Sequence, residues 1–428
     1  MFKKDDQKLE DITKKNKTYL NIITKIKTFF SLFIYLVIIV YSLEILLFSF
    51  TSDLQKSLVD IKGKRIEIAK KKNLKFDSRD SNIVFLEKRN EIKNLSVPFY
   101  YSSLFANLNT FKKAKKNNQT IPFRGPLNKK TLSCAEDLTY RIITNDKYGF
   151  KNSNSIYKKE IEVILLGGSY AEGFCYTSDK DIAGNLLKEE INTLNLGIAT
   201  TGPLVALAVL KEFGLKYKPK NVFYLYYENT SLDILEWEAK SKNLNRYLEK
   251  NYKTDYLKNI DKVKNFLSSA EKESLKIAYA KVKENKRLVD KRKSYKKNIK
   301  DILELSTLKK KVRSFSSDSK KNYDLKFFNK VMTSMQNETK KWNGKFTVVY
   351  VPSWDRFFNK GSNSYSLINL RTTIINSLQK NKINLVDLTE HFSSLKNLSD
   401  YYPLGYVGHF NESGYKKISD VIKKEITK

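Results

Sequence analysis

The feature that most constrains the fold is a series of five short apolar segments that alternate with segments of helical spacing. The short segments are rich in Ile, Val, Leu, Phe and Tyr, and most are continuously apolar, as expected of strands buried on both faces of a parallel sheet. They are residues 161–166, 191–196, 221–227, 346–351 and 383–388. Strands that alternate with helices predict an α/β domain with a doubly wound sheet, in which functional groups gather at the carboxyl ends of the strands.

Near the N-terminus, residues 29–50 form an apolar run of 22 residues with one charged side chain, Glu44. This length suffices for one transmembrane helix. A cleaved signal peptide is the alternative, but the run is long for one and no small-x-small cleavage site follows it. Because long domains translocate largely regardless of their charge, we expect residues 1–28 to form a cytoplasmic tail. Residues from 51 onward are then expected on the periplasmic, extracytoplasmic side of a bacterial inner membrane.

The composition of the remaining residues changes along the chain and suggests further boundaries. Residues 51–90 are highly charged and predict a juxtamembrane helix or stalk, whereas residues 91–150 contain prolines and several aromatic residues and predict an irregular cap. Residues 151–428 hold the α/β domain. Within it, residues 235–339 are rich in Lys, Glu, Leu and Tyr at helical spacing, which predicts a helical insertion, either a lid over the site or a packed appendage.

The charge balance of the chain is strongly basic, with 80 basic and 46 acidic residues among 428 and a formal net charge of +34. Most of the basic residues are lysines scattered along the sequence, and no recognisable nucleic-acid-binding module is present. We therefore expect a lysine-rich solvated surface and no nucleic-acid partner. The chain has two cysteines, Cys134 and Cys175. Two cysteines exclude a multi-cysteine metal site, and we expect neither a metal nor a cofactor.

Two residues at opposite ends of the α/β domain have the chemistry of an acyl-transfer site. Ser169 follows the first strand in LLGGSYAEG, where its hydroxyl would lie at the sheet edge and its amide near a helix N-terminus that stabilises an oxyanion. His409 precedes Asn411, the expected N-cap of the last helix. A fold that joins Ser169 to His409 would make them nucleophile and general base. The other histidine, His391, is interpreted as a surface or packing residue.

These motifs resemble those of the SGNH/GDSL hydrolase superfamily, whose members are esterases, lipases and carbohydrate acyl hydrolases or acyltransferases. The resemblance runs from about residue 133 to the C-terminus and is weakest in the helical insertion. It implies a flavodoxin-like, five-stranded doubly wound sheet. It also implies that Ser169 is the nucleophile, in a Gly-Gly-Ser turn where the family has Gly-Asp-Ser, and that His409 is the base.

The resemblance further implies an oxyanion hole. The amide that the family takes from a glycine falls at Thr200, with Gly197 nearby in the same loop. The family's asparagine at the end of the third strand has no direct counterpart in YYENTSLDI. Either Asn229 turns in through a local shift, or Thr230 donates its hydroxyl.

The residue that would hold the second nitrogen of His409 departs from the family pattern. The usual aspartate, three residues before the histidine, is replaced by Tyr406, a poor charge partner at neutral pH. Asp355 and Asp387 follow the fourth and fifth strands. Asp355 is preferred because it lies in a post-strand loop, whereas Asp387 is still within its strand pattern. A backbone carbonyl in place of an acid is favoured equally with Asp355.

Cys134 and Cys175 are expected to form a disulfide bond, because both would lie outside the inner membrane, where thiol pairs are oxidised. Cys175 lies six residues after Ser169, and Cys134 lies in the expected cap. The bond would therefore tie the cap to the turn that holds the nucleophile.

Three functions are compatible with these features. The leading hypothesis is a membrane-anchored hydrolase or acyltransferase that acts on ester-linked acyl groups of envelope polysaccharide or lipid. The second is a catalytically degenerate protein that binds a glycan or an envelope protein without turnover, which the missing aspartate and the shifted asparagine favour. The third is a membrane-tethered structural protein whose basic surface binds anionic polymers, with binding that weakens in salt.

Overall fold

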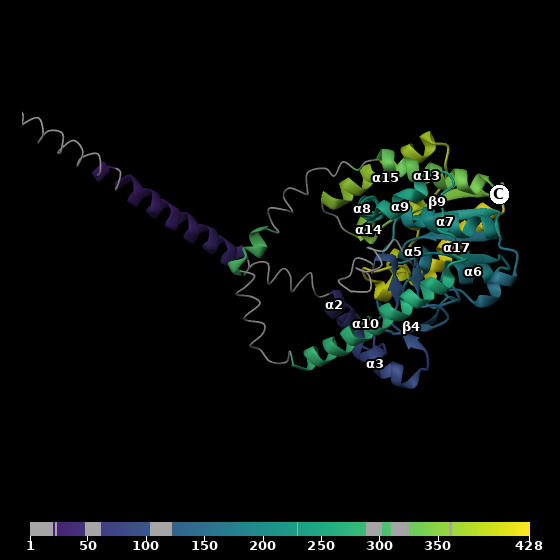
Figure 1. The fold of residues 1–428 in the computed structure, drawn as a ribbon, viewed down its shortest axis with the longest axis horizontal. Coiled ribbons are helices and arrows are strands. Elements are labelled where there is room, and N and C mark those ends of the chain that lie inside the picture. The colour runs from purple at the N-terminus through teal and green to yellow at the C-terminus, as the bar shows by residue number, and fades with distance from the viewer. Residues whose placement is uncertain are drawn as a thin grey trace, which may run out of the picture. The chain divides into compact units, whose positions relative to one another are not determined.

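The computed structural model describes residues 20–21, 24–47, 61–102, 122–228, 230–287, 302–309, 323, 325–358 and 362–428. These residues fall into two compact units (Figure 1). The first unit combines residues 1–60 with 287–321, and the second combines residues 61–286 with 322–428. Ser169 and His409 both lie in the second unit.

The first unit contains the helix Thr24–Leu47 (purple in Figure 1), which is long and apolar enough to cross a membrane. It covers most of the predicted span 29–50, whose last residues lie outside the described part of the chain. The helix fits either a single-pass anchor or a signal sequence. Near its end, the buried carboxylate of Glu44 accepts hydrogen bonds from the amides of Thr307 and Leu308, at 2.8 and 2.7 Å. A short segment of the predicted insertion therefore packs on this apolar helix.

The second unit is built on a parallel sheet of five strands. The strands are β6 (Val163–Gly167), β7 (Thr193–Asn195), β8 (Asn221–Tyr227), β9 (Lys345–Val351) and β10 (Asn384–Asp387). They lie in the order β7-β6-β8-β9-β10, and every neighbouring pair is parallel. Numbered along the chain, this is the order 2-1-3-4-5 of a flavodoxin-like, doubly wound sheet. The predicted fold class is confirmed, and each predicted strand overlaps an observed one.

Alternate residues of the strands pack on opposite faces of the sheet, and helices cover both faces. In β6, Ile164 and Leu166 belong to one buried cluster, whereas Val163 and Leu165 belong to another. The first face is covered by α7 (Pro203–Tyr217), α13 (Leu325–Lys340) and α15 (Ser362–Lys380), and the second by α6 (Ile182–Lys188), α16 (Leu388–Ser393) and α17 (Glu412–Ile426). Strands buried on both faces explain why the predicted segments are continuously apolar.

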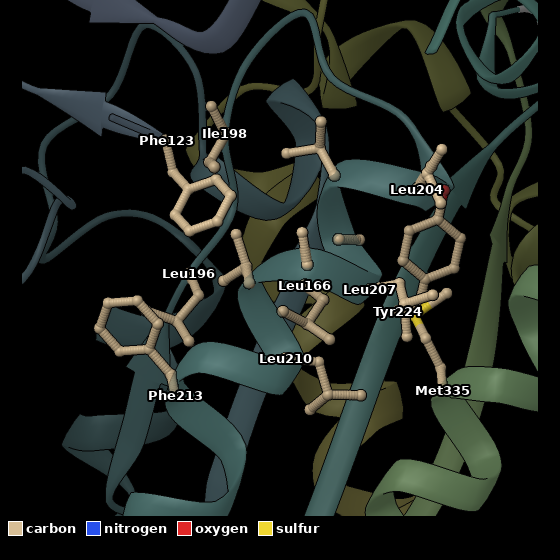
Figure 2. Close-up of a cluster of buried hydrophobic side chains, with 14 of the residues drawn as sticks. Phe123, Leu166, Leu196, Ile198, Leu204, Leu207, Leu210, Phe213, Tyr224 and Met335 are labelled. Atoms are coloured by element: carbon tan, nitrogen blue, oxygen red, sulfur yellow. The ribbon is translucent and has the colours of Figure 1, made fainter. Parts of the chain in front are cut away.

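Figure 2 shows part of the first buried cluster. Leu166 and Tyr224 from the sheet pack with Leu207 and Leu210 of α7 and with Met335 of α13. This packing holds β6 and β8 in place, and their carboxyl ends form the sheet edge at which functional groups of this fold gather.

Small sheets and two helices precede the central sheet. The helices are α2 (Ile61–Lys71) and α3 (Ser81–Glu91), which overlap the segment 51–90 expected to form a juxtamembrane helix or stalk. One small sheet contains β1 (Leu95–Ser96), β4 (Lys130–Leu132) and β5 (Ile142–Thr144), and another pairs β2 (Phe99–Tyr100) with β3 (Arg124–Gly125). These strands occupy the expected cap, residues 91–150, of which 103–121 lie outside the described residues.

The segment predicted as a helical insertion, residues 235–339, shares its ends with the α/β core. It begins within α8 (Ser231–Glu238) and ends within α13, whose Phe328 and Met332 are buried in the first cluster. α13 is thus a crossover helix between β8 and β9. Between them lie α9 (Lys242–Asn245), η3 (Arg246–Leu248) and the long helix α10 (Ile260–Arg287). The remaining short helices are η2 (Asn154–Lys158), α5 (Ser169–Glu172), α14 (Trp354–Phe358), η4 (Leu398–Tyr401) and η5 (Pro403–Gly405).

Candidate active site

The end of β6 positions Ser169. The strand ends at Gly167, whose φ of 138° is a conformation that L side chains rarely adopt. A Cβ atom there would lie 2.8 Å from the carbonyl oxygen of Leu225, so the turn requires glycine. Helix α5 begins directly afterwards and places the half-buried Ser169 at the carboxyl edge of the sheet.

His409 lies in the loop that precedes the last helix. Asn411 caps α17 by accepting a backbone hydrogen bond of 3.0 Å in its first turn, which fixes where the helix begins. The His409 Nε2 atom lies 2.7 Å from the Ser169 Oγ atom. The imidazole also contacts the rings of Tyr170 and Phe174, with centroid distances of 4.8 and 5.1 Å. The fold thus joins a serine and a histidine that are 240 residues apart in the chain.

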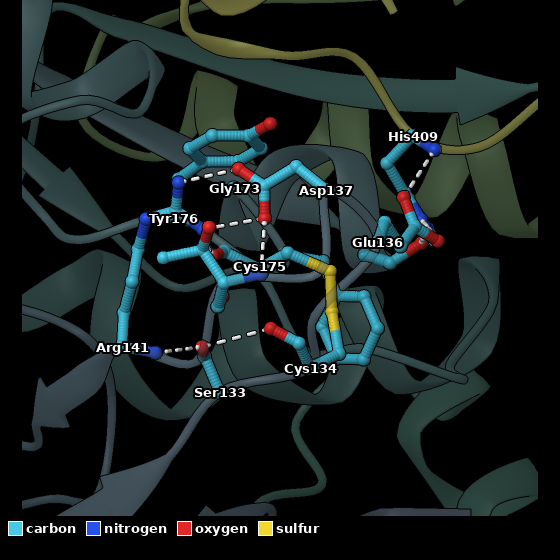
Figure 3. The surroundings of a disulfide bond; sticks show 12 residues. Ser133, Cys134, Glu136, Asp137, Arg141, Gly173, Cys175, Tyr176 and His409 are labelled. Atoms are coloured by element: carbon cyan, nitrogen blue, oxygen red, sulfur yellow. Dashed lines mark hydrogen bonds and ion pairs between the residues drawn. A yellow bond between two sulfur atoms is a disulfide. The ribbon is translucent and has the colours of Figure 1, made fainter. Parts of the chain in front are cut away.

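The second nitrogen of His409 is held by Glu136, a residue of the cap (Figure 3). The Nδ1 atom lies 2.9 Å from Glu136 Oε1, and the His409 amide donates a hydrogen bond to Oε2 at 2.7 Å. Burial alone would raise the pKa of Glu136, but the hydrogen bonds and charge of His409, with a contribution from Arg65, outweigh burial and lower the pKa below its ordinary value. An ionised carboxylate here favours the tautomer whose Nε2 accepts the serine proton.

The structure corrects the expected acid. Asp355 is not the partner of the His409 Nδ1 atom, because the Glu136 carboxylate occupies that position. Asp355 lies in the first turn of α14 and lines the cavity beside the serine. Asp387 instead caps α16 and accepts a hydrogen bond from Arg371 at 2.7 Å. The alternative of a backbone carbonyl in place of an acid is wrong for the same reason as Asp355.

Sequence reasoning missed Glu136 because no local pattern marks it. Glu136 lies 273 residues before His409, in an irregular segment without strand–helix alternation. The disulfide bond is the signal that could have pointed to Glu136. Glu136 lies two residues after Cys134, and Cys134 is bonded to Cys175, six residues after Ser169. The disulfide therefore brings the acid toward the nucleophile.

Cys134 and Cys175 form a disulfide in the structure, the pair expected from the sequence (Figure 3). Their Cα atoms lie 4.8 Å apart, and the bond links the cap to the turn after α5. Beside it, Arg141 pairs with Asp137 at 2.5 Å and packs on the ring of Tyr176 at 4.6 Å. Covalent and ionic contacts together hold this part of the cap against the segment that follows Ser169.

A buried ion pair fixes the loop that follows the second strand of the sheet. Glu172 of α5 pairs with Arg124 of β3 at 2.6 Å, and both side chains are almost fully buried. The other carboxylate oxygen of Glu172 accepts a hydrogen bond from the Ala199 amide at 2.6 Å. The next residue, Thr200, has a φ of 63° and lines the cavity together with Ser169. Within the described residues, the amides of Ser169 and Thr200 donate no hydrogen bond, which leaves both for a developing oxyanion.

The other residues expected in the oxyanion hole are Gly197, Thr230 and Asn229. The expectation for Gly197 is wrong, because its amide donates to the side chain of Asn195 at 2.9 Å. A Cβ atom at Gly197 would lie 2.3 Å from the Glu172 amide nitrogen, so this glycine serves the close approach of the loop to α5. Thr230 lines the cavity. Asn229 lies outside the described residues.

A cavity of about 610 Å³ opens beside the serine and the histidine. Its volume is typical of a small-molecule site. Most of its surface is apolar or aromatic, and three carboxylates border it, one of them that of Glu136. The lining residues include Tyr227, Ile234, Trp237, Trp354, Asp233 and Asp355. Several of these belong to α8, so the first part of the predicted insertion borders the site.

Metal-ligating side chains do not gather in the part of the chain that the structure describes. No three His, Cys, Asp or Glu side chains there come close enough to hold a metal ion. His391 is exposed on α16.

Comparison with known proteins gives a structural likeness. No protein-family model matches the chain, and no curated protein matches its sequence. The structure is similar to a GDSL-like lipase from Bacteroides thetaiotaomicron, with 13% identity and a TM-score of 0.33, over 63% of this chain and 89% of that one. It is also similar to a lipase/acylhydrolase from Enterococcus faecalis, with 12% identity and a TM-score of 0.34, over 62% of this chain and 95% of that one.

A third similar structure is the psychrotrophic esterase EstA from Pseudoalteromonas sp., with 11% identity and a TM-score of 0.30, over 62% of this chain and 100% of that one. At these identities and TM-scores the fold assignment depends on the chain's own strand order. That order defines a flavodoxin-like, doubly wound α/β fold, with a serine after the first strand of the sheet and a histidine before the last helix.

Proposed function

We propose that this chain is a membrane-anchored serine esterase of the SGNH/GDSL type that removes or transfers an ester-linked acyl group of an envelope polysaccharide or lipid. One observation carries the proposal. The Ser169 hydroxyl, the His409 imidazole and the Glu136 carboxylate form a continuous chain of contacts, at 2.7 and 2.9 Å, beside an open cavity. Nucleophile, base and acid stand in the order that acyl transfer requires.

In the first half of the reaction, Ser169 Oγ attacks the carbonyl carbon of the ester while His409 Nε2 takes the hydroxyl proton. The negative charge of Glu136 stabilises the imidazolium that forms. The amides of Ser169 and Thr200, with the hydroxyl of Thr230, bind the carbonyl oxygen as it becomes an oxyanion. The intermediate then collapses, the ester C–O bond breaks, and His409 gives its proton to the departing alkoxide.

In the second half, a hydroxyl compound resolves the acyl-enzyme. His409 takes a proton from this nucleophile, whose oxygen bonds to the acyl carbon, and returns the proton to Ser169 Oγ as the acyl–serine bond breaks. Water as the nucleophile makes the protein a hydrolase, and a sugar or lipid hydroxyl makes it an acyltransferase. The broad aromatic cavity leaves room for either acceptor.

The location of the proposed substrate rests on two features. The apolar helix Thr24–Leu47 has the length of a single-pass anchor. The disulfide Cys134–Cys175 is typical of proteins in oxidising compartments outside the cytoplasm. Anchored there, the site would meet acylated polysaccharide and lipid at the membrane surface. The Trp237 and Trp354 side chains offer flat apolar faces to a sugar ring or an acyl chain.

The proposal is tested by assaying the full chain, purified in detergent, on a chromogenic acetate ester. Replacement of Ser169 by Ala is expected to lower kcat/KM by roughly 10³-fold or more, because the nucleophile is lost. Ser268→Ala, at an exposed serine of α10, is the matched control and should keep wild-type activity. Equal activity of the Ser169→Ala variant and wild type would refute the proposal.

A catalytically inactive binding protein is the second candidate. Gly168 and Thr230 stand where the related family has the Asp of its Gly-Asp-Ser motif and an Asn, which favours this reading. A fluorophosphonate probe separates the two candidates, because only a nucleophile activated by a base reacts with it. Labelling of Ser169 in wild type and its loss in His409→Ala support the enzyme. Absence of labelling, together with equal binding of acylated polysaccharide by wild type and Ser169→Ala, supports the binding protein.

A further inference from the structure

We propose that Arg65, on the helix that follows the membrane-spanning segment in the chain, is a positioning residue that holds the acid and the base of the active site together. The inference rests on the proposed function, since it assigns Arg65 a task within the same site. It makes α2 part of the catalytic unit.

The contacts of Arg65 carry the inference. Its Nη2 atom donates a hydrogen bond to the carbonyl oxygen of Val407 at 2.6 Å. The same atom lies 3.9 Å from Glu136 Oε1, the oxygen that faces His409. The Arg65 side chain is only 13% exposed, so water screens these interactions little. One guanidinium therefore reaches the carboxylate that holds the imidazole and the backbone two residues before the imidazole.

Gly408, between Val407 and His409, shows how closely Glu136 and Arg65 are packed. A Cβ atom at Gly408 would lie 2.8 Å from Glu136 Oε2 and 2.9 Å from Arg65 Nη2. Any side chain at this position would push the carboxylate or the guanidinium aside. Glycine at position 408 thus allows Glu136 and Arg65 to meet beside His409.

Further features of α2 agree with a task in the site. Lys64 lies over the ring of Tyr406, with its Nζ atom 5.9 Å from the ring centroid. α2 therefore contacts successive residues of the loop that leads to His409. The Arg65 Nε atom is buried and has no hydrogen-bond partner among the described residues. A buried N–H without a partner lowers stability, so stability alone does not account for this arginine.

The charge of Arg65 predicts a specific pH effect. The active form of the pair has a neutral His409 and an ionised Glu136, and adding one proton to the pair abolishes activity. The positive charge of Arg65 opposes that added proton and lowers the pKa of Glu136. Removal of this charge makes protonation easier, so the acid limb of the kcat/KM profile moves to higher pH.

The experiment uses the full chain in detergent with three variants, Arg65→Met, Arg65→Lys and Lys71→Met. Arg65→Met should lower kcat by roughly 10- to 100-fold with little change in KM, because the base and acid lose their alignment and the substrate contacts remain. It should also move the acid limb to higher pH. Arg65→Lys keeps the charge and should keep the position of the limb while kcat falls. Lys71→Met removes an exposed charge from the same helix and should behave as wild type.

A second measurement does not depend on turnover. The chain has two histidines, so histidine labelled with ¹³C at Cε1 gives two NMR signals that His391→Gln assigns. In Arg65→Met, the His409 signal at neutral pH should move relative to wild type, because the ring loses its fixed position beside Glu136, while the signal of the exposed His391 stays in place. If wild type turns over no ester but the His409 signal moves, the proposed function fails and the positioning role stands. Unchanged kcat, acid limb and His409 signal in a folded Arg65→Met protein would overturn the role of Arg65.

Discussion

The proposed active site has two halves that are held in different ways. Ser169 and His409 belong to the α/β sheet, and backbone geometry places them: a glycine turn after β6 and an asparagine cap before α17. Glu136 and Arg65 belong to segments that precede the sheet, and side-chain contacts and one disulfide place them. The comparison shows that the positions of Ser169 and His409 depend on the fold of the sheet, whereas the position of Glu136, the proposed acid, depends on the docking of the cap.

Electrostatics differ between the two halves as well. Glu136 has charged partners, and its pKa is lowered. Glu238, at the end of α8, is fully buried, and among the described residues it accepts hydrogen bonds from backbone amides, those of Gly202, Leu204 and Val205 at the start of α7. Burial therefore raises its pKa to about 7 despite these hydrogen bonds. The pKa values of the half-buried Glu136 and the buried Glu238 are thus displaced in opposite directions, because Glu136 lies beside His409 and Arg65 whereas Glu238 lies against backbone amides.

The largest effect on kcat is expected when Glu136 is substituted. Glu136→Gln should lower kcat by roughly 10³- to 10⁴-fold at neutral pH, because a neutral amide neither fixes the histidine tautomer nor stabilises the imidazolium. Asp355→Asn is the matched control at the acid expected from the sequence, and it should change kcat only a few-fold. Steady-state kinetics on the chromogenic ester, with thermal unfolding to verify folding, measure both. The reverse ranking of the two variants would show that the acid belongs to the sheet half.

A smaller effect is expected when the covalent link between the halves is removed. The double variant Cys134→Ser/Cys175→Ser should lose about 4 kcal/mol of unfolding free energy, by the loop-entropy estimate for a separation of 41 residues. Its kcat should fall by roughly tenfold, because the cap still docks through ion pairs but holds Glu136 less firmly. Denaturant unfolding and kinetics with and without dithiothreitol measure these changes. Wild-type kcat in the reduced protein would mean that side-chain contacts alone place Glu136.

The smallest effect on turnover is expected at Glu238, whose influence is on stability. Its pKa is 4.5 in the unfolded chain and about 7 in the folded protein. The folded state therefore binds more protons between these values, and its stability falls as pH rises from 4.5 through 7, by roughly 3 kcal/mol in total. Glu238→Gln should remove this slope and leave kcat within a few-fold of wild type. Urea unfolding at pH 5 and pH 8 gives the slope, and an unchanged slope in the variant would contradict the assignment.

The sheet half could be predicted from the sequence because its signals are local. The strands are continuously apolar, and β8 has the predicted bounds, residues 221–227. Ser169 and His409 can be identified from the sequence, because Ser169 follows a strand end and His409 precedes a helix cap. Short motifs mark both features. The disulfide could be expected because the chain has two cysteines.

The positions of Glu136 and Arg65 could not be predicted, because their contacts join segments that share no pattern of strand or helix periodicity. The sequence favours Asp355 as the acid because it follows a strand, and Asp355 does line the cavity. The His409 imidazole, however, contacts Glu136, and this contact depends on how the cap docks on the sheet. No pattern marks Arg65, because its segment contains many charged residues. The family resemblance places Gly197 near an oxyanion hole, but its amide donates to Asn195 within its own loop.

The order of the site residues along the chain has a consequence for biosynthesis. Arg65, Glu136 and Ser169 leave the ribosome in that sequence, and His409 follows 240 residues after Ser169. While the chain is being made, the disulfide can draw Glu136 and Ser169 together before His409 has been added. Synthesis must pass His409, and α17 must dock on the sheet, before an imidazole reaches the serine hydroxyl. The contact between Ser169 and His409 is therefore among the last features of this site to form.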